Sequence, residues 1–83
     1  MTDTARLRRI IRERGYSVAE LAEELGITAS GLSRRIRNEG EFRTAELDRL
    51  CRLLRIDGAE ERRAIFFAGE VDGKSTNPAP KGR

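Results

Sequence analysis

The apolar positions of this chain recur three or four residues apart, the period of an α-helix, and turn-forming residues separate the runs. The first run consists of Leu7, Ile10 and Ile11. It predicts a helix over residues 4–14 that ends at Gly15. Asp3 or Thr4 can cap its first turn.

Two further helices are predicted on either side of one tight turn. Ser17 and Glu20 have the spacing of a capping box, which marks the start of the second helix. Gly26 follows the last apolar position of that helix, where a left-handed residue is needed to end it. Thr28 comes two residues later and can cap a third helix that runs to about Arg37. The pattern therefore predicts two short helices in close succession.

The second half of the chain predicts two more helices. Thr44 can cap a helix with an apolar stripe that contains Leu47, Leu50, Cys51 and Leu54. Asp57-Gly58-Ala59-Glu60 has the form of another capping box and opens a fifth helix that runs to Ala68. From residue 69 the composition turns to Gly, Pro, Ser, Asn and charge. We expect an all-α fold, a compact bundle of about five short helices over residues 1–68, followed by a flexible, disordered tail, 69–83.

Composition agrees with one small folded domain. The chain has 83 residues, of which 37% are hydrophobic and 37% charged, which is too apolar for a wholly disordered protein. The formal net charge is only +3, so the location of the charges matters more than their sum. No carboxylate occurs in residues 28–38, which include Arg34, Arg35 and Arg37. The third predicted helix is therefore locally basic.

The third predicted helix has two chemically different sides. At about 100° per residue, its small and apolar residues Ala29, Leu32 and Ile36 cluster on one side. Ser30, Arg34 and Arg37 fall nearly opposite, flanked by Gly31 and Ser33. Many all-α domains contain a helix-turn-helix that serves only as a packed corner. A helix face of small hydroxyl residues, glycine and arginine, however, is narrow enough to enter the DNA major groove. Its side-chain donors can bind phosphates and guanine O6 and N7. We therefore favour double-stranded DNA as the partner.

A family resemblance points the same way. The segment V-A-E-L-A-E-E-L-G-I-T-A-S-G-L-S-R-R-I resembles the helix-turn-helix of Cro/repressor-type (XRE-like) regulators, and the resemblance extends over about residues 4–68, closest to small Cro-like phage proteins. Ala22, Gly26 and Leu32 match the small, turn and aliphatic positions of that motif. The chain departs from it at Val18, where the family often has Gln, and at Arg35, where it often has an apolar residue. The resemblance implies a lambda-repressor-like fold and sequence-specific DNA binding by a transcriptional repressor of phage or bacterial type.

The resemblance and the helical periodicity together predict the contact residues. The expected base-reading residues are Ala29, Ser30, Ser33 and Arg34. The expected contacts to the DNA backbone are Ser17, Thr28, Arg35, Arg37, Asn38, Arg43 and Thr44. Among all of these, Arg34 is the residue from which we expect the strongest sequence discrimination.

Two adjacent aromatic residues suggest a second partner. Phe66 and Phe67 point about 100° apart on a helix, so a small core accepts one of them readily while the other stays near the surface. Regulators of the resembled family usually bind two-fold operators as dimers. We therefore expect a homodimer with Phe66 and Phe67 as the contact residues.

Other classes of function are less well supported. Histidine is absent, the single cysteine lies within an apolar stripe, and no phosphate-binding glycine loop is present, so the sequence favours neither an enzyme nor a metal or cofactor site. No small-molecule ligand and no membrane segment are predicted, and we expect a cytoplasmic protein. The main alternative is a protein-interaction module, such as an antitoxin or adaptor, with a helix-turn-helix fold. RNA binding is a third possibility, disfavoured by the scarcity of aromatic residues for base stacking.

Overall fold

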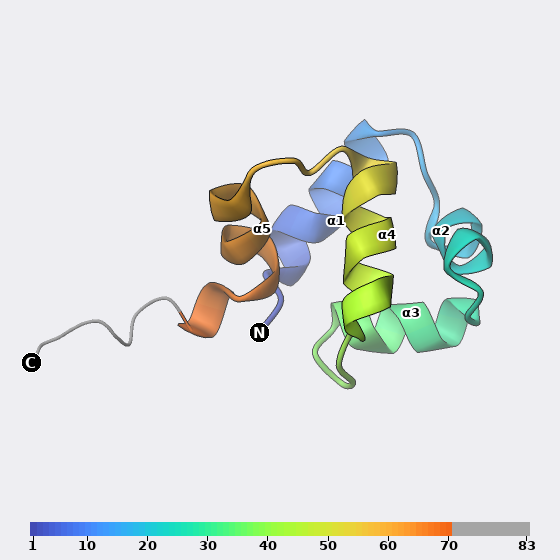
Figure 1. Ribbon diagram of the computed structural model, residues 1–83. Coiled ribbons are helices and arrows are strands. Elements are labelled where there is room, and N and C mark those ends of the chain that lie inside the picture. Colours follow the sequence, from blue (N-terminus) through green and yellow to red (C-terminus); the bar gives the residue numbers. More distant parts are fainter. Residues whose placement is uncertain (71–83) are drawn as a thin grey trace, which may run out of the picture.

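The computed structural model describes residues 1–70, and this part of the chain contains helices and no strand. The helices are α1 (Thr4–Glu13), α2 (Val18–Leu25), α3 (Ala29–Ile36), α4 (Thr44–Leu54), α5 (Ala59–Phe66) and a short 3₁₀ helix, η1 (Ala68–Glu70). Figure 1 shows α3 lying across the lower end of α4. In this view α2 lies on one side of α4 and α5 on the other. The predicted all-α bundle with a helix-turn-helix is confirmed.

The helix boundaries around the central turn follow the predicted caps. The Ser17 hydroxyl accepts the Glu20 N–H at 3.1 Å, and the Glu20 carboxylate accepts the Ser17 N–H at 2.9 Å, which completes the capping box. Gly26 ends α2 with φ 74°, in the left-handed region. The Thr28 hydroxyl accepts the Gly31 N–H at 2.9 Å and caps α3. These three signals therefore fix the turn.

Two predicted caps were wrong by one residue. Thr44 is the first residue of α4, and the cap is Arg43, whose N–H donates to the Glu46 carboxylate at 3.0 Å. Because Glu46 satisfies that amide, the helix needs no hydroxyl cap. Asp57 does not cap α5 either, because the extended residue directly before the helix is Gly58, which has no side chain to offer.

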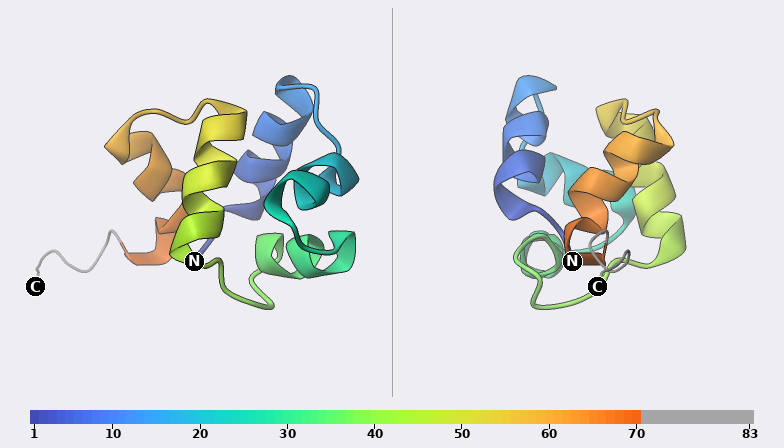
Figure 2. Two further views of the ribbon diagram at one scale, coloured as in Figure 1. Left: turned by 45° about the vertical axis from the view of Figure 1, so that its right-hand side comes forward. Right: turned by 90° about the vertical axis from the view of Figure 1, so that its left-hand side faces the viewer.

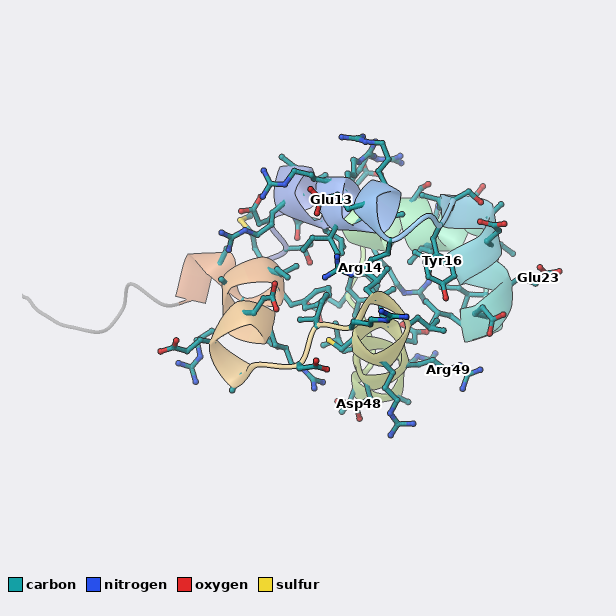
Figure 3. All side chains as sticks on the ribbon, turned by 90° about the horizontal axis from the view of Figure 1, so that it is seen from above. Glu13, Arg14, Tyr16, Glu23, Asp48 and Arg49 are labelled. Carbon is teal, nitrogen blue, oxygen red and sulfur yellow. The ribbon has the colours of Figure 1, made fainter. Side chains whose placement is uncertain are left out.

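One hydrophobic core joins all five α-helices. Its buried residues are Leu7, Ile10, Ile11, Leu21, Ala22, Leu32, Ile36, Leu47, Leu50, Cys51, Leu54, Ile56, Ile65 and Phe66. The predicted apolar stripes, including Cys51, supply most of these side chains. At one end of the core, Arg14 reaches from the end of α1 toward α4 (Figure 3), and its Nε donates to the Leu54 carbonyl at 2.8 Å.

The end of α5 differs from the prediction. The helix stops at Phe66 rather than at Ala68, because the backbone of Phe67 leaves the helical region with φ −128°. Most of the predicted tail, 71–83, lies outside the described residues. Its first two residues, Gly69 and Glu70, complete η1.

Candidate nucleic-acid interface

The helix-turn-helix formed by α2 and α3 places α3 at the lower edge of the molecule (Figure 2, left). Leu32 and Ile36, on the inner side of α3, are 0% and 1% exposed. Ala22 of α2 is also buried, and its carbonyl accepts the Ile27 N–H of the turn at 3.0 Å. Leu32 and Ile36 therefore hold the helix against the core, as the sequence pattern predicted. The pattern was wrong for Ala29, which it placed beside them: Ala29 is the first residue of α3 and is exposed.

The opposite side of α3 faces solvent. Ala29, Ser30, Arg34 and Arg37 are exposed, and Ser33 is half-buried. These five residues line one shallow depression along the helix. The structure thus brings together all four predicted base-reading residues on one outward surface, together with Arg37. We call these five residues the α3 outer face.

Within the described residues, the Arg34 guanidinium makes no hydrogen bond or ion pair, and the bond from the Glu39 N–H to Arg34 reaches only its backbone carbonyl. The guanidinium charge still acts on Glu39, because it contributes to lowering the pKa of that carboxylate, after the larger effect of Arg37. The guanidinium therefore keeps its donors for an external acceptor. A planar guanidinium with free donors matches the O6 and N7 acceptors of guanine.

Arg37 is exposed but has a partner. Its Nε donates to the Glu39 carboxylate at 3.2 Å, and its second guanidinium bond to the same carboxylate is 3.3 Å long. This hydrogen bond and the opposite charge lower the pKa of Glu39 and raise that of Arg37. Exposed ion pairs hold their partners weakly, so a DNA phosphate can replace Glu39.

Arg35, in contrast, points into the fold. Its Nε lies 3.2 Å from the Glu46 carboxylate, and it donates to the Glu41 carbonyl at 3.3 Å. The side chains of Arg35 and Glu46 are only 21% and 11% exposed. A phosphate contact by Arg35 would require these bonds to break.

Asn38 is also engaged within the protein. Its side-chain oxygen accepts the Thr2 N–H at 2.8 Å, and its side-chain amide donates to the Thr2 carbonyl at 2.9 Å. Its backbone has a φ of 66°, in the left-handed region. The predicted phosphate contact of Asn38 would likewise compete with existing hydrogen bonds.

The other predicted backbone contacts remain accessible. Ser17 and Thr28 accept backbone amides with their hydroxyl oxygens, which leaves each O–H free to donate. Arg43 and Thr44 are exposed at the start of α4. All four residues lie at helix N-termini, where unpaired amides favour anions.

The two phenylalanines at the end of α5 differ in burial. Phe66 is 4% exposed and belongs to the core, where its ring packs edge-on against Phe42, with ring centres 5.7 Å apart. Phe67 is half-buried. Phe67 is therefore the member of the predicted pair that can reach a partner.

Sequence reasoning missed the role of the N-terminal residues. The Thr4 hydroxyl donates to the Ile36 carbonyl at 2.6 Å, at the end of α3, and Thr2 pairs with Asn38. These contacts join residues 32 and 36 positions apart, so no local pattern could signal them.

The described residues hold no cluster of potential metal ligands and no helix long and apolar enough to cross a membrane. A family model described as Cro/C1-type HTH DNA-binding domain matches residues 6–60. The matched segment includes α2, the turn and the whole α3 outer face. No curated protein and no solved structure gives a match.

Proposed function

The chain belongs to the Cro/C1-type helix-turn-helix DNA-binding domain family, and on this premise we propose that it is a sequence-specific regulator of transcription that binds double-stranded DNA. The observation that carries the proposal is the division of α3. Leu32 and Ile36 are buried, while Ser30 and Arg34 face solvent. A helix anchored on one side and polar on the other can lie in the major groove without loss of core packing.

Base reading is assigned to Ala29, Ser30, Ser33 and Arg34 of the α3 outer face. Arg34 donates two hydrogen bonds to guanine O6 and N7, a contact worth about 1–3 kcal/mol of discrimination. The serine hydroxyls donate or accept at neighbouring base edges, and the methyl group of Ala29 suits a thymine methyl.

Phosphate contacts are assigned to the predicted residues whose side-chain donors are free or, for Arg37, paired only with the exposed Glu39. These are Ser17, Thr28, Arg37, Arg43 and Thr44. They come from the N-termini of α2, α3 and α4 and from the end of α3, so they hold the helix at both ends. Such contacts set orientation and affinity but do not read sequence.

A homodimer fits this mode of binding. Phe67 is half-buried beside η1, and Met1, whose backbone carbonyl bonds to Ala68 of η1, is 65% exposed. We propose that this apolar surface is buried between two copies, which would present two α3 helices to half-sites that lie about one DNA turn apart on a two-fold operator. We further propose that the bound dimer represses transcription in the bacterial or phage-infected cytoplasm, because occupancy of a promoter suffices for repression.

Selection from a random duplex library, followed by salt titration of the selected site, tests the proposal. We expect a palindromic motif and an affinity that falls steeply between about 50 and 200 mM salt. A matched control is Arg52→Ala, which removes an exposed arginine of α4 and should leave the selected motif unchanged. Failure to enrich any motif, with only weak binding common to all duplexes, would refute sequence-specific recognition.

A further inference from the structure

The N-terminal residues link the end of α3 to the end of α5. On one side, Thr2 is paired with Asn38 through two hydrogen bonds. On the other side, the Asp3 N–H donates to the Ile65 carbonyl at 2.6 Å, and the Met1 carbonyl accepts the Ala68 N–H at 2.9 Å. Figure 1 shows the N-terminus between η1 and the end of α3. We call residues 1–4 the N-terminal strap.

Asn38 meets two demands at this junction. It occupies the left-handed position that ends α3, where its N–H bonds to the Arg35 carbonyl at 3.2 Å, and the next amide, of Glu39, bonds to the Arg34 carbonyl at 2.8 Å. Asparagine tolerates this conformation better than most residues with a side chain. Its side chain also supplies one donor and one acceptor, which match the N–H and carbonyl of Thr2. Glycine meets only the first demand.

The contact is sheltered on the side of Thr2, although Asn38 itself is exposed. Thr2 is only 7% exposed, so its backbone groups have little access to water as an alternative partner. The Thr4 hydroxyl binds the Ile36 carbonyl, two residues before Asn38. Because α3 has only eight residues, the whole α3 outer face lies within about two helical turns of this contact.

We propose that Asn38 is a positioning residue for DNA binding, which fixes the end of α3 to the N-terminal strap and so holds the α3 outer face in one register on the bases. The inference rests on the proposed function. It assigns to Asn38 a role that differs from a phosphate contact, since its amide is directed at Thr2. The N-terminal strap also connects the end of α3 to Ile65 and Ala68, which flank Phe66 and Phe67 in the sequence.

Two variants test the contact from opposite sides. Asn38→Gly keeps the left-handed backbone and removes only the side-chain amide. Thr2→Pro removes the N–H that donates to Asn38 and leaves the sequence of α3 unchanged. For each variant we expect the ratio of affinities for selected and random duplexes to fall roughly three- to tenfold, as for the loss of one or two hydrogen bonds. The salt slope should stay unchanged, and the double variant should lose less than the sum of the two losses.

Amide hydrogen exchange of the free protein provides a readout independent of DNA. In both variants, exchange should accelerate at Arg37, Asn38 and Glu39, and the amide chemical shifts of Ser30 and Arg34 should move. Melting curves establish that the variants fold. If the wild type selects no duplex, the proposed function fails, while the exchange data still decide whether Asn38 holds the helix end.

Two outcomes overturn the inference. In the first, Asn38→Gly weakens binding to selected and random duplexes equally and Thr2→Pro has no effect, which makes Asn38 a phosphate contact. In the second, both variants retain wild-type discrimination and wild-type exchange at the end of α3, so that the two hydrogen bonds position nothing.

Discussion

Arg35 and Glu46 form an ion pair within the fold, with Nε and Oε1 3.2 Å apart, although Arg35 lies directly beside Arg34 of the α3 outer face. Glu46 also accepts the Arg43 N–H at 3.0 Å, so one carboxylate connects α3, the loop after it and the start of α4. Two adjacent arginines of one helix therefore differ: the Arg35 guanidinium is paired within the fold, and the Arg34 guanidinium faces solvent.

Arg35→Ala should lower the free energy of unfolding by about 1–3 kcal/mol, because it leaves Glu46 and the Glu41 carbonyl without a charged donor. Urea denaturation of the variant and the wild type measures this loss. In DNA binding, Arg35→Ala should leave the salt slope unchanged. The matched variant Arg37→Ala should do the reverse, with little change in stability and a salt slope smaller by about one unit. A reduced slope for Arg35→Ala would instead place its guanidinium on a phosphate.

Arg34→Ala should reduce sequence discrimination by about 1–3 kcal/mol, since it removes the two donors that we propose to bind guanine. Affinities for the selected site and for the same site with its guanine replaced measure this effect. The wild type should distinguish the two duplexes and the variant should not. Equal discrimination by the two proteins would show that another residue reads the guanine.

Glu39→Gln should strengthen DNA binding, because Glu39 occupies the Arg37 guanidinium and places a negative charge near Arg34. We expect a higher affinity for all duplexes and a steeper salt slope. Since Arg37 lowers the pKa of Glu39, the carboxylate stays charged at mildly acidic pH, and the gain requires the substitution rather than a change of buffer. Glu60→Gln, on the exposed first turn of α5, is the charge-matched control and should change affinity little. If both variants bind alike, the release of Arg37 contributes nothing.

The extent to which sequence predicted this structure depends on the range of each interaction. The Ser17–Glu20 box, the Gly26 turn and the Thr28 cap each lie within four residues, so residue type and spacing suffice to place them. The burial of Leu32 and Ile36 and the exposure of Arg34 follow from the helical period alone. The caps at Thr44 and Asp57 were misplaced by one residue, because α4 and α5 begin after Arg43 and Gly58, neither of which makes a side-chain cap that residue type could signal.

The site was predicted as a set of residue types but not as a set of partners. Ser30 and Arg34 face outward as their periodicity indicated. Arg35 pairs with Glu46, and Asn38 pairs with Thr2, only because the fold brings segments of the chain outside α3 next to it. The helical period places Arg35 nearer the apolar side of α3 than Arg34, but it does not identify Glu46 as the partner of Arg35.

Arg55→Gly should stabilise the protein by about 0.5–1 kcal/mol. Arg55 follows α4 with φ 59°, a left-handed conformation that costs a residue with a Cβ about 1–2 kcal/mol, part of which the greater unfolded-state entropy of glycine offsets. Thermal denaturation should show a rise of a few degrees. Gly26→Ala is the opposite test. A Cβ at Gly26 would have no neighbour within 4 Å, so only the φ of 74° opposes it, and the melting temperature should fall. An unchanged melting temperature for Arg55→Gly would mean that its side chain compensates the strain.

The thiol of Cys51 should react only when the protein unfolds. Cys51 is 4% exposed in the core, and burial raises the pKa of its thiol, with the charge of Arg62 opposing this effect and Asp48 and Glu61 adding to it. Alkylation at neutral pH should therefore proceed at a rate set by the unfolded population, and it should be rapid in urea. Because Arg55→Gly lowers that population, it should slow alkylation roughly two- to fivefold, the factor that corresponds to 0.5–1 kcal/mol. If this substitution leaves the alkylation rate unchanged, the thiol is reached by local opening around α4. The core would then unfold less cooperatively than its packing implies.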